Sequence, residues 1–72
     1  MTLEEAKQKI QVGKSYEHYK GRLYQVDIIA TDTENDEPMV VYHLFGTHEY
    51  FVRPVSMWLE NVSVPRFKLL GE

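Results

Sequence analysis

Hydrophobic residues recur with a helical period at the start of the chain. Leu3, Ala6 and Ile10 lie three and four residues apart, which predicts one apolar face of a helix. Thr2 is followed three residues later by a glutamate, the pattern of a capping box at a helix N-terminus. A glycine after the last of these positions is a typical helix stop. The sequence therefore predicts a helix over residues 2–12.

Beyond this helix the pattern changes to short runs with the period of β-strands. The run Leu23–Ala30 alternates between apolar and polar positions, which is typical of a half-buried strand. Its alternate residues are predicted to share one face: Tyr24, Val26, Ile28 and Ala30. The same criteria predict five strands in all: Ser15–Tyr19, Leu23–Ala30, Met39–Phe45, Glu49–Arg53 and Ser63–Leu69.

A proline in the last third of the chain indicates where a strand ends and a helical turn begins. Pro54 has no N–H for a sheet ladder and favours the first position of a helix, so Pro54–Leu59 is predicted as a helical turn. Acidic and turn-forming residues predict a loop over Thr31–Pro38. These elements predict a mainly β single domain, residues 1–72, in which 14–70 form a small five-stranded SH3-like antiparallel barrel.

The alternative fold is an open, strongly curved antiparallel sheet with the N-terminal helix packed across one face. In either fold the apolar members of each strand should meet in one core. The residues predicted to be least exposed are Val26, Ile28, Val41, Val52, Met57 and Phe67.

Composition excludes several classes of protein. The 72 residues carry a formal net charge of −3 and include no cysteine, so neither a disulfide nor a thiol nucleophile is available. That composition fits a reducing, cytoplasmic location. No apolar run approaches the ~18 residues of a membrane span, and the charged start does not resemble a signal peptide. The three histidines lack metal-ligand spacing, so no metal or other cofactor and no membrane contact are expected.

Three blocks of residues form a recognisable pattern: Tyr16–Val26, Val52–Glu60 and Val64–Phe67. The blocks read Y-x-H-Y-K-G-x-x-Y-x-V, V-R-P-x-x-M and V-P-R-F, and a V-V-Y at residues 40–42 lies between the first two. Together they resemble the bacterial family catalogued as domain of unknown function 1653. The resemblance implies that a histidine recurs at the place of His18 and that V-R-P is kept. Because that family is uncharacterised, the resemblance implies no activity.

The abundance of aromatic side chains indicates a candidate binding surface. Tyrosine and tryptophan anchor interfaces because each offers a large area with a polar tip. SH3-like modules bind peptides in aromatic grooves, and the corresponding places here are the first hairpin and the turn before the last strand. The sequence therefore predicts a non-catalytic interaction module that binds a protein segment through five residues: Tyr16, His18, Tyr19, Arg53 and Trp58.

Structural roles for the same side chains are alternatives that the sequence leaves open. His18 could be held by a backbone hydrogen bond, and Arg53 could pair with Glu49 or Glu60 inside the fold. The rings could belong to the core, or the exposed ones could build a homodimer.

A function of a different class is nucleic-acid or nucleotide binding. Arg22, Arg53 and Arg66 would then meet phosphates while an aromatic ring stacks on a base. The net charge of −3 weighs against this alternative, because phosphate contacts need a positive face. An enzyme is not predicted, since no nucleophile, base and oxyanion donors have a spacing that suggests proximity.

Overall fold

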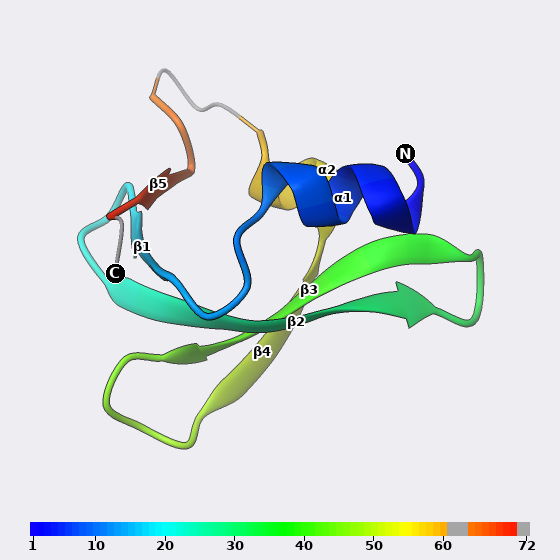
Figure 1. The fold of residues 1–72 in the computed structure, drawn as a ribbon. Coiled ribbons are helices and arrows are strands. Elements are labelled where there is room, and N and C mark those ends of the chain that lie inside the picture. The colour runs from blue at the N-terminus through cyan, green and yellow to red at the C-terminus, as the bar shows by residue number, and fades with distance from the viewer. Residues whose placement is uncertain (61–63, 71–72) are drawn as a thin grey trace.

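The computed structural model describes residues 1–60 and 64–70 (Figure 1). A short helix precedes the strands of a single antiparallel sheet, and a second, four-residue helix follows the fourth strand. The elements are α1 (Leu3–Lys9), β1 (Ser15–His18), β2 (Leu23–Asp32), β3 (Glu37–Leu44), β4 (Tyr50–Pro54), α2 (Val55–Trp58) and β5 (Phe67–Leu69). The predicted mainly β class with an N-terminal helix is therefore confirmed. Ser63, the predicted start of the last strand, lies outside the described residues.

Helix α1 begins with the predicted capping box. The Glu5 backbone N–H donates to Thr2 Oγ1 at 3.1 Å, and the Thr2 backbone N–H donates to Glu5 Oε1 at 2.8 Å. Ala6 and Ile10 are fully buried, so the apolar face docks on the sheet. The predicted end at residue 12 is wrong, because Ile10 already has an extended backbone and lies in the core.

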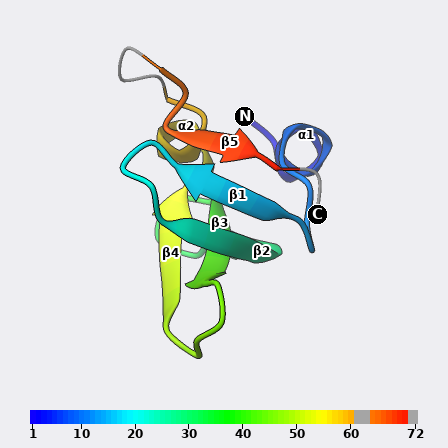
Figure 2. The same cartoon turned by 90° about the vertical axis from the view of Figure 1, so that its left-hand side faces the viewer.

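The sheet is open, so the predicted closed barrel is wrong. Its strand order is β4-β3-β2-β1-β5, every pairing is antiparallel, and β4 and β5 are the two edges. Closure would need hydrogen bonds between these edges, but β5 has only three residues and uses them to pair with β1. The sheet is instead strongly twisted, with α1 and α2 on the same side (Figures 1 and 2). This matches the alternative of a curved sheet with a helix across one face.

Strands β2 and β3 are longer than predicted and form a regular hairpin. Asp32 pairs with Glu37, so the predicted loop over Thr31–Pro38 shrinks to a tight turn. The turn is stabilised by side-chain oxygens, as the Glu34 backbone N–H donates to Asp32 Oδ1 at 2.9 Å. Strand β2 therefore runs across the full width of the molecule.

A β-bulge at Asp27 determines which residues of β2 enter the core. Val26 pairs with Tyr42, but the next pair along the ladder is Ile28 with Val41, so Asp27 is the extra residue. The bulge reverses the alternation, and the predicted burial of Ile28 is wrong: its side chain is 54% exposed, whereas Ile29 is 8% exposed.

Three further core predictions are wrong for related reasons. Val41 pairs with Ile28 on one side and with Val52 on the other, so all three lie in one row on the outer face. Val52 is therefore 59% exposed and Val41 is only partly buried. In α2 the buried residues are Val55 and Trp58, so Met57 points outward. Val26 and Phe67 are buried as predicted. The observed core consists of Ala6, Ile10, Tyr16, Val26, Ile29, Val40, Tyr42, Val55, Trp58 and Phe67.

No helix among residues 1–60 and 64–70 is both long and apolar enough to cross a membrane.

Candidate functional site

The cross-strand register divides the sheet into an inner face, which carries α1 and α2, and an outer face. Successive inner-face pairs are His18 with Phe67, Tyr16 with Tyr24, Tyr42 with Phe51 and Val40 with Arg53. The helices cover the part of this face around Val40, while one end keeps partly exposed side chains. We define the inner-face cluster as His18, Tyr24, Phe51, Arg53 and Phe67.

Phe67 is the centre of the inner-face cluster. Trp58 stacks on its ring at a centroid distance of 3.6 Å and an interplanar angle of 1°. The His18 ring meets it edge-on at 4.9 Å, and the Arg53 guanidinium lies 5.6 Å from its centroid. Two nitrogen-bearing side chains from strands that are not neighbours in the sheet, β1 and β4, thus contact the same buried ring.

Arg53 lies at this end without a carboxylate partner among the described residues. Its Nε–H donates to Tyr42 Oη at 3.3 Å, which fixes the direction of the guanidinium. The ion pairs among the described residues join Asp27 with His43 and Glu60 with Arg66, so the predicted internal pairing of Arg53 with Glu49 or Glu60 does not form. An arginine held in this way keeps further N–H groups for an anion.

His18 has the backbone hydrogen bond expected of a structural histidine. Its Nδ1 accepts from the Lys20 backbone N–H at 3.2 Å, so the neutral ring carries its proton on Nε2. Burial lowers the pKa of His18, and repulsion from Arg53, Arg66 and Lys20 lowers it further. Of these cations, Arg53 and Lys20 have no carboxylate partner among the described residues, so this end of the inner face is positively charged within a chain of net charge −3.

The depressed pKa of His18 predicts a loss of stability on mild acidification. Because the unfolded chain binds the proton more readily, stability falls as the pH drops through and below the ordinary value of 6.5. We expect His18→Gln to flatten this dependence when urea unfolding is compared at about pH 7.5 and about pH 5.5. His48→Gln, in the exposed turn before β4, controls for the loss of a histidine; equal slopes for wild type and His18→Gln would contradict the prediction.

Two of the predicted groove residues belong to the core. Tyr16 and Trp58 are 5% and 2% exposed and pack edge-to-face at 5.3 Å. The Tyr16 hydroxyl also accepts from the Gln11 backbone N–H at 3.0 Å, which ties the segment after α1 to β1. The predicted groove around these two rings is therefore not an open surface, and the alternative that they serve the core is the one observed.

Tyr19 lies on the rim of a different hollow. It is exposed, and the Lys20 Nζ stands 5.8 Å from its ring centroid. With His18 it borders a shallow depression of about 460 Å³, whose other described walls are Glu17, Val64, Pro65 and Lys68. His18 thus connects this depression with the inner-face cluster.

The arginines of the nucleic-acid alternative are not gathered in one place. Arg22 is exposed in the turn between β1 and β2. Arg66 donates from Nη2 to Glu60 Oε1 at 2.7 Å, so a carboxylate already neutralises it. Only Arg53 combines a guanidinium with an aromatic wall and no carboxylate partner among the described residues.

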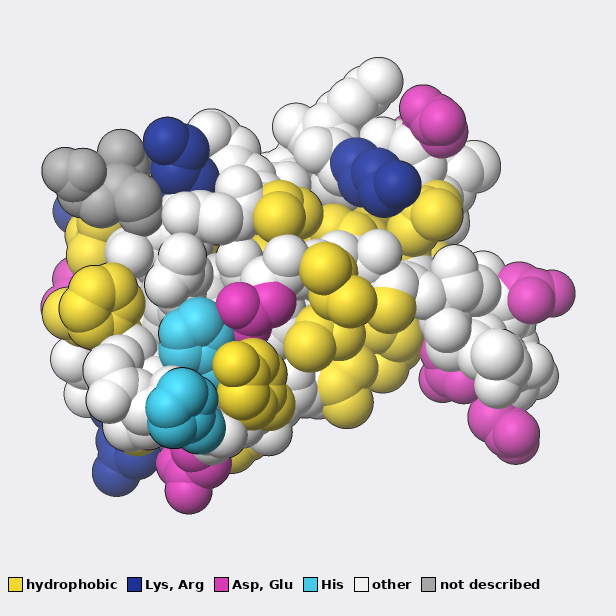
Figure 3. Space-filling model, turned by 60° about the horizontal axis from the view of Figure 1, so that its bottom comes forward, with side chains coloured by type: hydrophobic (Ala, Val, Ile, Leu, Met, Phe, Trp, Pro, Cys, Tyr) yellow, Lys and Arg dark blue, Asp and Glu magenta, His cyan; other side chains and the backbone are white. Residues whose placement is uncertain are grey.

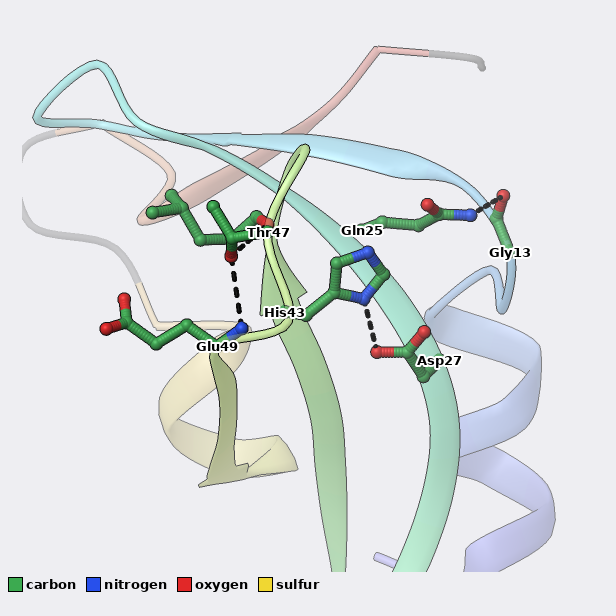
Figure 4. A network of polar contacts seen from close by, with 7 residues as sticks. Gly13, Gln25, Asp27, His43, Thr47 and Glu49 are labelled. Atoms are coloured by element: carbon green, nitrogen blue, oxygen red, sulfur yellow. Dashed lines mark hydrogen bonds and ion pairs between the residues drawn. The ribbon is translucent and has the colours of Figure 1, made fainter.

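A second polar feature, on the outer face, was not predicted from sequence patterns. Asp27 Oδ2 lies 2.7 Å from His43 Nδ1, and Gln25 Nε2 donates to the Gly13 carbonyl at 3.3 Å (Figure 4). The bulge aims Asp27 at His43, an effect that depends on long-range pairing. Such a pair can orient an imidazole, but its neighbours on this open face include exposed rings such as Tyr50, whose centroid lies 5.3 Å from that of His43.

Within the residues that the structure describes, no group of three or more histidine, cysteine, aspartate or glutamate side chains could hold a metal ion. The inner-face cluster includes three residues that the sequence did not single out as a site: Tyr24, Phe51 and Phe67. The sequence placed Tyr24 on one face of its strand and Phe67 in the core, but the meeting of these rings with Phe51 depends on the register of all five strands.

The fold and this cluster define a small β domain with an open five-stranded sheet and a cationic, aromatic end to its inner face. Residues 14–69 match the family model described as a protein of unknown function (DUF1653), and the chain belongs to this family. A crystal structure of a DUF1653 protein from Bordetella bronchiseptica is similar, with 32% sequence identity and a TM-score of 0.80. The likeness covers 90% of this chain and 92% of that one. No curated protein matches the chain.

Proposed function

We propose that this domain is a non-catalytic interaction module whose inner-face cluster binds a protein segment. The observation that carries the proposal is the placement of Arg53 and His18 against the single ring of Phe67, at a partly exposed end of the sheet. A guanidinium, an imidazole N–H and ring surface together offer charge, a directed donor and apolar area. Side chains of this kind are enriched among the anchors of protein interfaces.

Binding accounts for these side chains better than catalysis does. The recorded hydrogen bond of the His18 ring runs to a backbone N–H rather than to a carboxylate that would orient a general base. Arg53 is held by Tyr42 and Phe67, which suits recognition of an anionic group. The order of strands, with a helical turn before the last, also resembles that of small SH3-like domains, which use aromatic grooves for peptides.

Nucleic-acid binding is the weaker alternative. Its three arginines are dispersed, one of them is paired with Glu60, and the chain carries a net charge of −3. Phosphate binding through several cations would fall steeply with salt, whereas an aromatic peptide site responds much less. Salt dependence therefore separates the two functions.

The test is selection of peptides from a displayed random library, followed by titration of the best binder into the domain. We expect Arg53→Ala to weaken binding by about tenfold or more, the cost of losing a charged anchor. Arg22→Ala, which removes an exposed arginine outside the inner-face cluster, should leave the affinity within about twofold.

Three results would contradict the proposed function. The library could yield no binder, or Arg53→Ala could bind as tightly as wild type. A single-stranded oligonucleotide could instead bind the domain, with an affinity that falls by orders of magnitude between about 50 mM and about 200 mM salt.

A further inference from the structure

The free edge of β4 adds a second recognition element to the inner-face cluster. In the part of the chain that the structure describes, β4 pairs only with β3 and has no strand on its other side. The Leu44 backbone N–H donates to the Glu49 carbonyl, so these opposed residues form a hydrogen-bonded pair. In an antiparallel ladder, hydrogen-bonded and non-hydrogen-bonded pairs alternate. The backbone groups of Phe51 and Arg53 therefore bond to β3 as well.

The intervening residues of β4 therefore direct their backbone groups outward. Tyr50 and Val52 each present an N–H and a carbonyl along the edge, and Pro54 presents a carbonyl only. Tyr50, Phe51 and Val52 carry neither a charge nor a proline that would discourage pairing with another strand; Arg53 and Pro54 follow them at the end of β4. The edge thus offers the pattern of donors and acceptors that an extended peptide can match.

The side chains beside this edge differ between the two faces of the sheet. On the inner face lie Phe51 and Arg53, next to Phe67 and His18. On the outer face Val52 continues an apolar row with Val41 and Ile28, which gives exposed hydrophobic surface on the underside of the sheet (Figure 3). Because strand residues alternate between faces, a segment added here would meet both surfaces at once.

From this arrangement we infer that the bound segment adds to β4 as an extra strand and carries an acidic side chain toward Arg53. The inference rests on the proposed function and specifies the chemistry of its partner. In the antiparallel register, the residue opposite Arg53 is acidic, the next, opposite Val52, is apolar and β-branched, and the one opposite Phe51 is apolar. The acidic residue complements the positive charge of Arg53 and Lys20 beside His18, neither of which has a carboxylate partner among the described residues.

An extended peptide suits this edge better than a second copy of the chain. A copy pairing its own five-residue β4 here in antiparallel register, centred on Val52, would bring Phe51 opposite Arg53; only a register centred on Phe51 would bring a carboxylate there, that of Glu49, which lies outside β4. A nucleic-acid strand could meet the guanidinium, but it would leave the backbone groups of Tyr50 and Val52 without peptide partners. The free edge of β4 and the positive charge of Arg53 therefore both favour an extended peptide with an acidic side chain.

The probe is the peptide acetyl-Ser-Thr-Glu-Val-Leu-Thr-Ser-amide, whose glutamate, valine and leucine are placed to face Arg53, Val52 and Phe51. Binding is followed by the backbone amide spectrum and by amide hydrogen exchange. We expect the exchange of the Tyr50 and Val52 amides to slow on binding by about tenfold or more. The Phe51 and Arg53 amides, which already bond to β3, are the internal controls.

Two substitutions in the domain and one in the probe test strand addition and the acidic contact separately. Val52→Pro removes the outward N–H and leaves the hydrogen bonds between β4 and β3 in place, so the domain should fold and bind the probe about tenfold or more weakly. Val52→Thr keeps the N–H and the β-branched shape and should retain binding. Replacing the probe's glutamate with lysine should reverse the charge complementarity and also weaken binding by about tenfold or more.

The possible outcomes distinguish strand addition, the acidic partner and the proposed function from one another. Slowed exchange at Tyr50 and Val52, lost in Val52→Pro, supports the inference. Binding that depends on Arg53 without slowed exchange, or that survives Val52→Pro, overturns strand addition and leaves the proposed function standing. Library binders without acidic residues, or a lysine probe that binds equally, overturn the acidic partner. Failure of the probe, when library peptides bind through Arg53, also overturns the inference, whereas failure of both overturns the proposed function as well.

Discussion

Replacing Trp58 with alanine is expected to destabilise the domain by about 3–5 kcal/mol, as for other fully buried aromatic residues. The indole is 2% exposed, stacks on Phe67 at 3.6 Å, and meets Tyr42 and Tyr16 edge-to-face at 4.8 and 5.3 Å. Small domains have total stabilities near the low end of about 5–15 kcal/mol. A substantial fraction of the variant should therefore be unfolded at room temperature.

The neighbouring Met57 provides the matched control for Trp58. It lies in the same four-residue helix but is 42% exposed, so Met57→Ala should cost less than about 1 kcal/mol. Urea unfolding followed by far-ultraviolet circular dichroism is the appropriate measurement, because Trp58 is the only tryptophan and its loss removes the fluorescence signal. Similar costs for the two variants, or a Trp58→Ala protein that keeps its stability, would place the indole outside the core.

The contrast between Trp58 and Met57 shows what sequence patterns omit. Pro54 correctly indicated the end of β4 and the start of a helical turn, because both effects are local to the proline. A four-residue helix has no repeated apolar period, so its pattern does not say which side packs inward. That choice depends on the ring of Phe67, which comes from β5 at the far end of the sheet order.

The capping box and the antiparallel sheet were predictable for the same reason of locality. The Thr2 and Glu5 side chains and backbones satisfy each other within one turn, so the start of α1 follows from the sequence alone. Barrel closure cannot be predicted from local sequence in this way, because it depends on whether the two edge strands meet after all other contacts have formed. Here β5 is three residues long and bonds only to β1.

The candidate site was predictable only in part. His18 follows Tyr16 by two residues in one strand, so their shared face could be deduced from alternation. Arg53 reaches the same end only through the pairing of β4 with β3 and through the aromatic rings between them. The sequence therefore indicated side chains suited to recognition, while the register decided which of them are exposed together.

The two isoleucines after the bulge provide a direct test of that register. Ile29 is 8% exposed and pairs with Val40 in the core, whereas Ile28 is 54% exposed and pairs with Val41 on the outer face. Ile29→Ala should lower the free energy of unfolding by about 2–5 kcal/mol, the usual cost of truncating a buried isoleucine. Ile28→Ala should cost less than about 1 kcal/mol, because its side chain gains little from burial.

Urea unfolding of both variants, followed by tryptophan fluorescence, measures the difference with Trp58 as an internal probe. Adjacent residues of the same type share nearly the same strand propensity, so the comparison isolates burial from backbone preference. Simple alternation from Val26 predicts the opposite result, with Ile28 buried and Ile29 exposed. A larger cost for Ile28→Ala would therefore mean that β2 lacks the Asp27 bulge and that the apolar row on the outer face, on which the strand-addition inference depends, belongs to the core instead.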